Sequence, residues 1–247
     1  MHIIPTVLSV SISTFLIVPI AYANAFDPPP GQGMPKGTVG GGSRPSVPGC
    51  LIPSESEATP ILLAPKRYLG LTTQSHPTFW VYLPATSAKT IEFSLFDHTR
   101  KGIYQVSLPI PSSAGLTAIP LPKAGPGLSY DRSYHWTIAL VCNPKRRPED
   151  WVTGGWIQRQ KLSDRLQQTL NQNSNSIDQA TSYLQSNFWY DALTRRLESP
   201  PETRDLPELT TLWFSAFDSA GIPVPSTFIP DRLSTRRSTT DRKSSNP

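Results

Sequence analysis

The stretch YHWTIALVC at residues 134–142 decides the fold class of this chain. Every second side chain in it is apolar or aromatic, from Tyr134 through Trp136 to Cys142. Alternate side chains of a β-strand point to opposite faces of a sheet, so these residues form one apolar face. The intervening residues, such as His135 and Thr137, form a mixed face. The pattern predicts a half-buried antiparallel strand that ends in a cysteine.

Short candidate strands lie on both sides of this stretch. Turn-forming residues separate them at short intervals. Such a series of short strands indicates two sheets packed face to face. Residues 50–160 are therefore predicted to form an immunoglobulin- or fibronectin-like antiparallel β-sandwich. The candidate strands are 61–64, 67–73, 78–83, 91–95, 104–108, 116–121 and 155–160.

Aromatic residues at three positions support the sandwich. Tyr134 begins the long strand after a loop rich in Gly and Pro, shortly downstream of Leu128. A tyrosine corner, in which the phenol bonds to upstream backbone where the chain crosses between sheets, has this arrangement. Trp80, on an earlier candidate strand, and Trp136 are expected to pack together in the core.

The period of the apolar residues changes after the last candidate strand. Leucines recur at every fourth position from Leu162 to Leu170, which is the spacing of one helix face. Ser163 is a candidate N-cap, and Asn187 suits the left-handed conformation at the end of a helix. Residues 161–222 are therefore predicted to form a small α-helical unit, which makes the fold class α+β. The candidate helices are 163–170, 177–184, 192–197 and 206–220.

The N-terminal segment predicts export. Residues 1–25 contain no Lys, Arg, Asp or Glu, are mostly apolar, and end in two small-x-small sites. This composition is typical of a secretory signal, here with cleavage before Asn24 or Phe26. An uncleaved membrane anchor is the alternative, because the apolar part is long enough to span a bilayer. We expect a periplasmic or extracellular location, with membrane contact only if the signal stays attached.

Two further segments are too polar to form a packed core. Residues 26–49 are rich in Pro, Gly and Ser and are predicted to be a linker, and residues 223–247 are predicted to be a disordered basic tail. The chain has a formal net charge of +5 and contains 27 prolines. Prolines favour loops and strand edges over a helical bundle.

The chain has two cysteines, Cys50 and Cys142. In an oxidising compartment they are expected to form a disulfide that attaches the start of the sandwich to its longest strand. Closing a loop of this size stabilises a fold by about 4–5 kcal/mol in the chain-entropy model. Two free, buried thiols are the alternative.

Several sequence blocks together resemble one family. The chain is similar to a domain of unknown function found in cyanobacteria, DUF928, over roughly residues 37–220. It departs from the usual family pattern at Asn187-Phe188, where Gly-Ile is common. The resemblance implies a cyanobacterial source and an exported location, and it implies no activity and no catalytic residue. The blocks are 37–44 before Cys50, 77–82, 93–95, 134–142, 155–159 and 189–193.

Patterns for catalysis and metal binding are weak in this sequence. The four histidines show neither i, i+4 nor His-x-His spacing, and a Gly-x-Ser-x-Gly nucleophile motif is absent. The acidic residues are scattered, and Asp191 is the most interesting of them. As an early helix residue it would either complement the helix dipole or serve as a functional group. We therefore predict no metal and no cofactor.

A basic cluster is the main candidate for an interaction surface. Lys145, Arg146 and Arg147 lie in a predicted loop with Trp151 and Trp156 nearby. Cations beside aromatic rings are typical of single-stranded nucleic-acid binding, but an exported protein seldom meets nucleic acid, so we predict no such partner. Two interpretations of the cluster are left open. It is either a solvated loop or a surface that contacts anionic polysaccharide or lipid head groups. Together with Trp189 and Asp191, these residues are the possible interaction residues.

The sequence favours a non-enzymatic exported module that acts through contacts with a protein or with the envelope surface. An envelope glycan hydrolase or a carbohydrate-binding protein is the alternative. A hydrolase would need two acids that face each other in a pocket. We expect Trp151 or Trp156 to line such a pocket if it exists.

Overall fold

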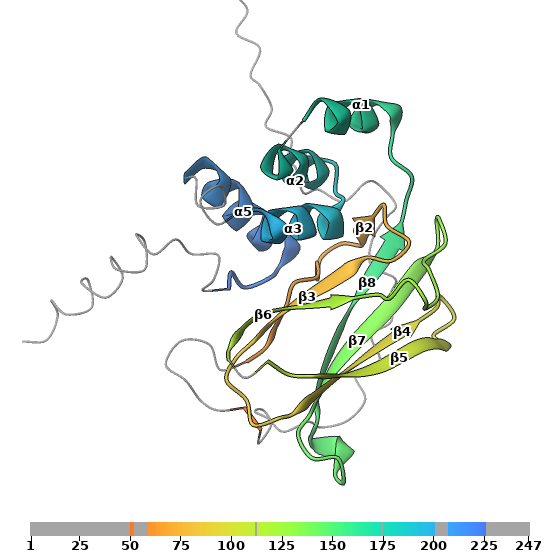
Figure 1. Ribbon diagram of the computed structural model, residues 1–247, viewed down its shortest axis with the longest axis vertical. Helices are drawn as coiled ribbons and strands as arrows, with labels where there is room; N and C mark the ends of the chain where they lie inside the picture. The colour runs from red at the N-terminus through yellow and green to blue at the C-terminus, as the bar shows by residue number, and fades with distance from the viewer. Residues whose placement is uncertain (1–49, 52–58, 112, 174, 201–206, 226–247) are drawn as a thin grey trace, which may run out of the picture.

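The computed structural model describes residues 50–51, 59–111, 113–173, 175–200 and 207–225. In this part of the chain the fold is α+β, with two β-sheets and four α-helices (Figure 1). The predicted signal segment, the predicted linker and nearly all of the predicted tail lie outside the described residues.

The strands and helices follow one another along the chain in the predicted order. The strands are β1 (Ile61–Leu62), β2 (Gly70–Thr72), β3 (Thr78–Leu83), β4 (Thr90–Phe96), β5 (Gly102–Pro109), β6 (Gly115–Pro120), β7 (Ser133–Val141) and β8 (Trp151–Arg159). A short 3-10 helix, η1 (Arg147–Glu149), precedes β8. The helices are α1 (Asp164–Gln172), α2 (Ser176–Gln185), α3 (Trp189–Glu198) and α5 (Pro207–Ala220).

The strands form a three-stranded and a five-stranded sheet. The three-stranded sheet has the order β1-β3-β6, and the five-stranded sheet has the order β2-β8-β7-β4-β5. The prediction of purely antiparallel pairing was wrong, because β2 runs parallel to β8 and Tyr130 forms an isolated parallel bridge with Arg159. After β1, the chain crosses from the first sheet to the edge of the second, and there it runs in the same direction as β8.

The inner faces of the two sheets meet through aromatic side chains. The ring of Phe79 on β3 lies 4.9 Å from the ring of Phe93 on β4 and 4.6 Å from that of Trp136 on β7, measured between centroids. The predicted contact between Trp80 and Trp136 was therefore wrong. Trp80 points away from the second sheet, and its Nε1 donates to Oγ1 of Thr194 on α3, at 3.1 Å.

Strand β7 has the predicted two faces. Tyr134, Trp136, Ile138 and Leu140 are all buried. The phenol oxygen of Tyr134 accepts a hydrogen bond from the backbone N–H of Ser129 at 3.1 Å. The predicted bond from this tyrosine to upstream backbone is thus confirmed.

Local signals in the sequence set the limits of the helices. The side chain of Ser163 accepts from the backbone N–H of Leu166 and caps α1, as predicted. Asn175 caps α2 in the same way. Asn187 adopts φ 64°, which confirms the predicted left-handed residue between α2 and α3, and Gly221 adopts φ 69° after α5. Among the described residues, no helix has the length and hydropathy needed to cross a bilayer.

Candidate functional site

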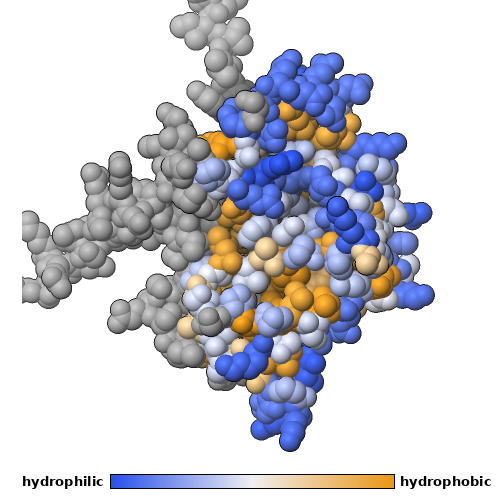
Figure 2. Space-filling model, in the orientation of Figure 1, coloured by the Kyte–Doolittle hydropathy of each residue, from blue (hydrophilic) through white to orange (hydrophobic). Residues whose placement is uncertain are grey.

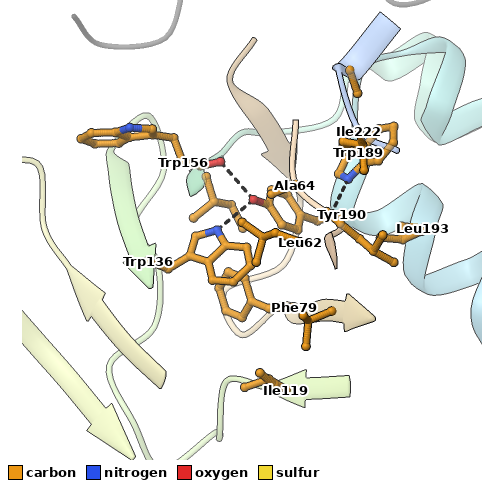
Figure 3. Close-up of a cluster of buried hydrophobic side chains, with 14 of the residues drawn as sticks. Leu62, Ala64, Phe79, Ile119, Trp136, Trp156, Trp189, Tyr190, Leu193 and Ile222 are labelled. Carbon is orange, nitrogen blue, oxygen red and sulfur yellow. Dashed lines mark hydrogen bonds between the residues drawn. The ribbon is translucent and has the colours of Figure 1, made fainter. Parts of the chain in front are cut away.

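Helix α3 packs on β2 and β3 and closes one side of the two sheets (Figure 1). We call the residues that meet there, Trp136, Trp156, Trp189, Tyr190 and Asp191, the helix–sheet junction. The phenol oxygen of Tyr190 accepts from Nε1 of Trp136 at 2.9 Å and donates to the backbone oxygen of Trp156 at 3.0 Å (Figure 3). Burial raises the pKa of this phenol, so it stays neutral.

The approach of α3 to β2 requires a glycine. A Cβ atom at Gly70 would lie 2.6 Å from Cε2 of Tyr190, a distance at which the ring or the strand would have to move. Gly70 therefore lets the aromatic ring of α3 lie directly against the backbone of β2.

Trp189 lies inside the protein. It is 1 % exposed, its Nε1 donates to the backbone oxygen of Leu63 at 2.9 Å, and its ring lies near those of Trp213 and Phe217 on α5. Trp156 is 7 % exposed, and its ring centroid lies 4.9 Å from that of His135. Both side chains are buried within the protein, which weakens the prediction that Trp156 and Trp189 are interaction residues.

Asp191 connects α3 to the end of β2. Its carboxylate accepts from the backbone N–H of Thr73 at 3.0 Å and also from the Thr73 hydroxyl. The residue is 6 % exposed. Burial raises the pKa of its carboxyl group, and the hydrogen bonds from Thr73 partly oppose this effect. These contacts support a structural role for Asp191, which is one of the two alternatives that the sequence left open.

A polar cleft of about 240 Å³ lies beside Asp191, between the segment after β2 and helices α2 and α3. Gln74, His76, Arg195 and Glu198 contribute to its lining. His76 is already engaged, with Nδ1 3.0 Å from Oγ of Ser75 and Nε2 3.3 Å from the backbone oxygen of Gly125.

The acids that line the cleft bear on the predicted alternative of a glycan hydrolase. Its lining includes two acids, Asp191 and Glu198, but the carboxylate of Asp191 is occupied by Thr73. Among the described residues, neither Trp151 nor Trp156 lines it. In the same part of the chain, no three His, Cys, Asp or Glu side chains are grouped so as to hold a metal ion.

Ion pairs reduce the charge of the predicted basic cluster. Arg147 pairs with Asp150 and with Glu92, and Nη2 of Arg147 lies 3.2 Å from Oε1 of Glu92. The hydrogen bonds to these two carboxylates raise the pKa of the Arg147 guanidinium. Arg146 pairs with Glu149 at 2.9 Å. Lys145 is exposed and Trp151 is half-buried at the start of β8. The loop is therefore close to neutral, which weakens the prediction of an anionic ligand.

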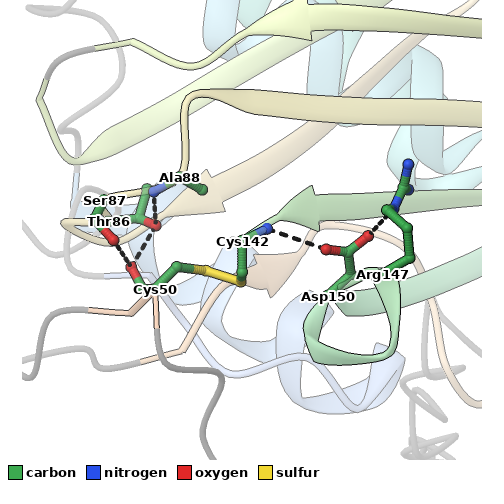
Figure 4. The surroundings of a disulfide bond; sticks show 7 residues. All are labelled: Cys50, Thr86, Ser87, Ala88, Cys142, Arg147 and Asp150. Carbon is green, nitrogen blue, oxygen red and sulfur yellow. Dashed lines mark hydrogen bonds and ion pairs between the residues drawn. A yellow bond between two sulfur atoms is a disulfide. The ribbon is translucent and has the colours of Figure 1, made fainter. Parts of the chain in front are cut away.

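The predicted disulfide between Cys50 and Cys142 is present, with Cα atoms 5.2 Å apart (Figure 4). The backbone oxygen of Cys50 accepts from the N–H of Ser87 at 2.8 Å. The backbone N–H of Cys142 donates to the buried carboxylate of Asp150 at 3.1 Å. The bond thus attaches the start of the described chain to the end of β7 and to the loop before β8.

Strand β5 forms the edge of the five-stranded sheet, on the side away from α3. We call its residues 103–108 the open edge. Tyr104, Val106 and Leu108 lie opposite three residues of β4 that are at most 1 % exposed, so they belong to the inner face of the sheet. Yet all three are only half-buried. The three-stranded sheet therefore leaves the inner face of β5 incompletely covered.

The open edge carries no charge. The sequence from residue 102 to residue 122 contains no Lys, Arg, His, Asp or Glu, and it includes both β5 and β6, an edge strand of the three-stranded sheet. Figure 2 shows apolar side chains in the middle of the face that is turned to the viewer. Exposed edge strands usually carry charges that prevent pairing with another chain. Our sequence analysis missed this region, although the uncharged run between Lys101 and Lys123 is visible in the sequence.

The opposite face of β5 is hollowed. A cleft of about 330 Å³ lies there, lined by residues of β4 and β5 that include Phe96, Ile103 and Gln105. An added strand gains affinity from backbone hydrogen bonds and specificity from pockets for its alternate side chains. The open edge offers both of these features.

The model of a protein family matches residues 39–224, and the family is described as Domain of Unknown Function (DUF928). The chain belongs to this family. The DUF928 match includes the disulfide, both sheets and all the described helices. A search of the curated proteins found no match. The cyanobacterial source stays a prediction.

Four of the sequence blocks that carried the resemblance to DUF928 meet at the helix–sheet junction. The block 189–193 supplies Trp189, Tyr190 and Asp191. The blocks 134–142 and 155–159 supply the two tryptophans to which the phenol of Tyr190 is bonded. The block 77–82 forms β3, on which α3 packs. These contacts are internal, so the sequence pattern that identifies this DUF928 chain describes its core.

Proposed function

We propose that this DUF928 protein is a non-enzymatic interaction module of the periplasm or cell envelope that binds a protein partner through the open edge. One observation carries the proposal: a half-buried apolar face lies on an uncharged edge strand. Uncovered apolar surface beside unpaired backbone groups is typical of a site for another chain. A partner that adds a strand would cover both.

The proposal includes an immunoglobulin- or fibronectin-like sandwich. The strand order supports it, because β1, β3 and β6 form one sheet while β4, β5, β7 and β8 belong to the other. The bond between Tyr134 and the backbone of Ser129 supports it as well, since a tyrosine corner is frequent in such domains. Folds of this class often act as binding modules, but the fold itself does not imply a partner.

The proposal also includes export from a cyanobacterial cell. The uncharged segment 1–25 supports a signal peptide, and the disulfide between Cys50 and Cys142 supports an oxidising compartment. N-terminal sequencing of the protein from its native cell tests this part. We expect a start at Asn24 or Phe26, and recovery of intact Met1 in the membrane fraction would mean an anchor instead.

A photo-crosslinking residue tests the interaction surface. It replaces Ser107 on the open edge in one variant and Lys145 on the basic loop in the other, and both positions are exposed. We expect a covalent adduct with a partner in living cells from position 107 and none from position 145. The reverse result would move the surface to the basic loop. No adduct from either position would contradict the proposal.

The polar cleft favours one alternative, a carbohydrate-binding protein. Its rim carries the exposed side chains of Arg195, Glu198 and Gln74, which suit sugar hydroxyl groups. Titration with soluble peptidoglycan fragments, followed by amide NMR, tests this function. Shifts confined to the cleft and abolished by Glu198→Gln would support it over the open edge.

A further inference from the structure

We infer that the open edge pairs with the same edge of a second copy of this chain, in an antiparallel ladder in which Val106 lies opposite Val106. The inference uses the surface of the proposed function and names its partner. It follows from three properties of β5: its position in the sheet, its two faces and its lack of charge.

The position of β5 leaves one side of its backbone available. β5 pairs with β4 on one side and is the last strand of the five-stranded sheet on the other. Pro109 and Pro111 lack a backbone N–H, so a ladder on the outer side is limited to about residues 103–108. A ladder of this length suits pairing with one strand of equal length.

The two faces of β5 restrict the register. A slip by one residue would turn every side chain of the added strand to the wrong face. The inner face carries Tyr104, Val106 and Leu108, so these residues must meet inner-face residues of the second copy. A twofold axis at Val106 satisfies this condition, because it places Tyr104 opposite Leu108 in both halves of the ladder. Aromatic and branched apolar pairs of this kind stabilise a sheet.

The lack of charge permits pairing between identical strands. In this register Gln105 lies opposite Ser107 on the outer face, and Lys101, the nearest charged residue, lies opposite Pro111. Like charges directly opposite each other normally prevent such pairing, and here there are none. The formal net charge is +5, so two copies repel each other, and a neutral edge is where that repulsion is weakest.

β5 is electrostatically compatible with a second β5, because residues 103–108 carry no charged side chain. A strand that fits the open edge must be uncharged and must carry apolar side chains at every second position. Residues 103–108 meet both requirements. Because the contact uses the same surface on both copies, it closes after two copies and gives a dimer, not a fibre.

Two matched double variants test the pairing on the outer face, where Gln105 and Ser107 are exposed. Gln105→Lys with Ser107→Lys brings two ammonium groups face to face at two places in the ladder. Gln105→Glu with Ser107→Lys brings opposite charges together at the same places. By sedimentation equilibrium of the exported, oxidised protein, we expect a wild-type dimer. The first variant should raise the dimer Kd about tenfold or more, and the second should keep it near the wild-type value.

A cysteine at the twofold axis tests the register. Val106→Cys should form a disulfide-linked dimer under mild oxidation, because the two new thiols face each other. Leu108→Cys is the matched control, since it faces Tyr104 and should stay monomeric on a non-reducing gel. Thermal melts of each variant show whether the fold is retained.

A wild-type protein that is monomeric at the highest attainable concentration would overturn the inference. A dimer that both double variants leave unchanged would overturn it too. The crosslinking experiment at position 107 distinguishes failure of the pairing between copies from failure of the proposed function. A different protein captured there would refute pairing between copies and leave the interaction module standing, whereas no adduct would remove both.

Discussion

The helix–sheet junction and the open edge lie at opposite sides of the same two sheets and are completed in opposite ways. At the junction, α3 covers the sheet edge, and the buried polar groups of Trp136, Tyr190 and Asp191 all have partners within the chain. At the open edge, Tyr104 and Val106 are half-buried, and β5 pairs with β4 alone.

The difference teaches where to look for function in this protein. Aromatic and acidic residues attracted attention in the sequence, and at the junction they turn out to hold the fold together. Buried polar groups with complete hydrogen bonding stabilise one arrangement and leave little for a ligand. Plain apolar residues on a neutral strand attracted no attention, yet they form the surface through which we propose that another chain binds.

The largest expected difference between the two regions concerns side-chain packing. Trp189→Ala would remove an indole that is 1 % exposed and is bonded to Leu63, so we expect it to lower the unfolding free energy by about 3–5 kcal/mol. Val106→Ala at the open edge should cost less than about 1 kcal/mol, because the side chain is half-buried. Urea denaturation of both variants measures this, and equal losses would erase the distinction between the regions.

Removal of the phenol oxygen from a tyrosine in each region compares the junction and the open edge at the level of one atom. Tyr190→Phe would leave the buried Nε1 of Trp136 and the backbone oxygen of Trp156 without the phenol, and we expect a loss of about 1–3 kcal/mol. Tyr104→Phe is the matched control on the half-buried edge and should stay within about 0.5 kcal/mol of wild type. Thermal melts followed by near-UV circular dichroism measure both. A control loss as large as that of Tyr190→Phe would contradict the prediction.

The two regions should also differ in their dependence on pH. Burial raises the pKa of Asp191 in the folded state, so folded protein holds this proton at pH values where unfolded chain has released it. The stabilisation that this proton gives the fold is complete at pH values below the pKa of the carboxyl group in the unfolded chain, about 3.9. It is lost as the pH rises towards the pKa of the same group in the folded protein. We expect the unfolding free energy of wild type to fall relative to that of Asp191→Asn as pH rises through this window.

The open edge supplies the control for that experiment. Residues 102–122 contain no Asp, Glu, His, Lys or Arg, so dimerisation through β5 should not change over the same pH window. Denaturation at a series of pH values measures the first effect, and sedimentation measures the second. Parallel curves for wild type and Asp191→Asn would show that the carboxyl group titrates normally in the fold.

The smallest expected effect is on folding at the edge itself. The pair Gln105→Lys and Ser107→Lys should change the unfolding free energy by no more than about 0.5 kcal/mol, because both side chains are exposed. The same pair should raise the dimer Kd about tenfold or more. A large loss of stability would mean that these positions support the fold, and the contrast with the junction would then weaken.

The sequence by itself determined the secondary structure and its order. The alternation in residues 134–142 predicted β7, and Ser163 and Asn187 marked limits of helices. Two cysteines in a chain that is predicted to be exported predicted their pairing. The strand and helix signals are local, and each of the two cysteines has a single possible partner within the chain. The family also followed from short blocks of sequence.

Only the tertiary structure decided which faces are covered. Alternation in β3 separates Phe79 from Trp80 but does not say which of them meets the second sheet. The parallel pairing of β2 with β8, the burial of Trp156 and Trp189, and the exposure of β5 depend on where distant segments pack. Periodicity records that a face is apolar, whereas burial depends on which other element reaches it, and that is a property of the whole chain.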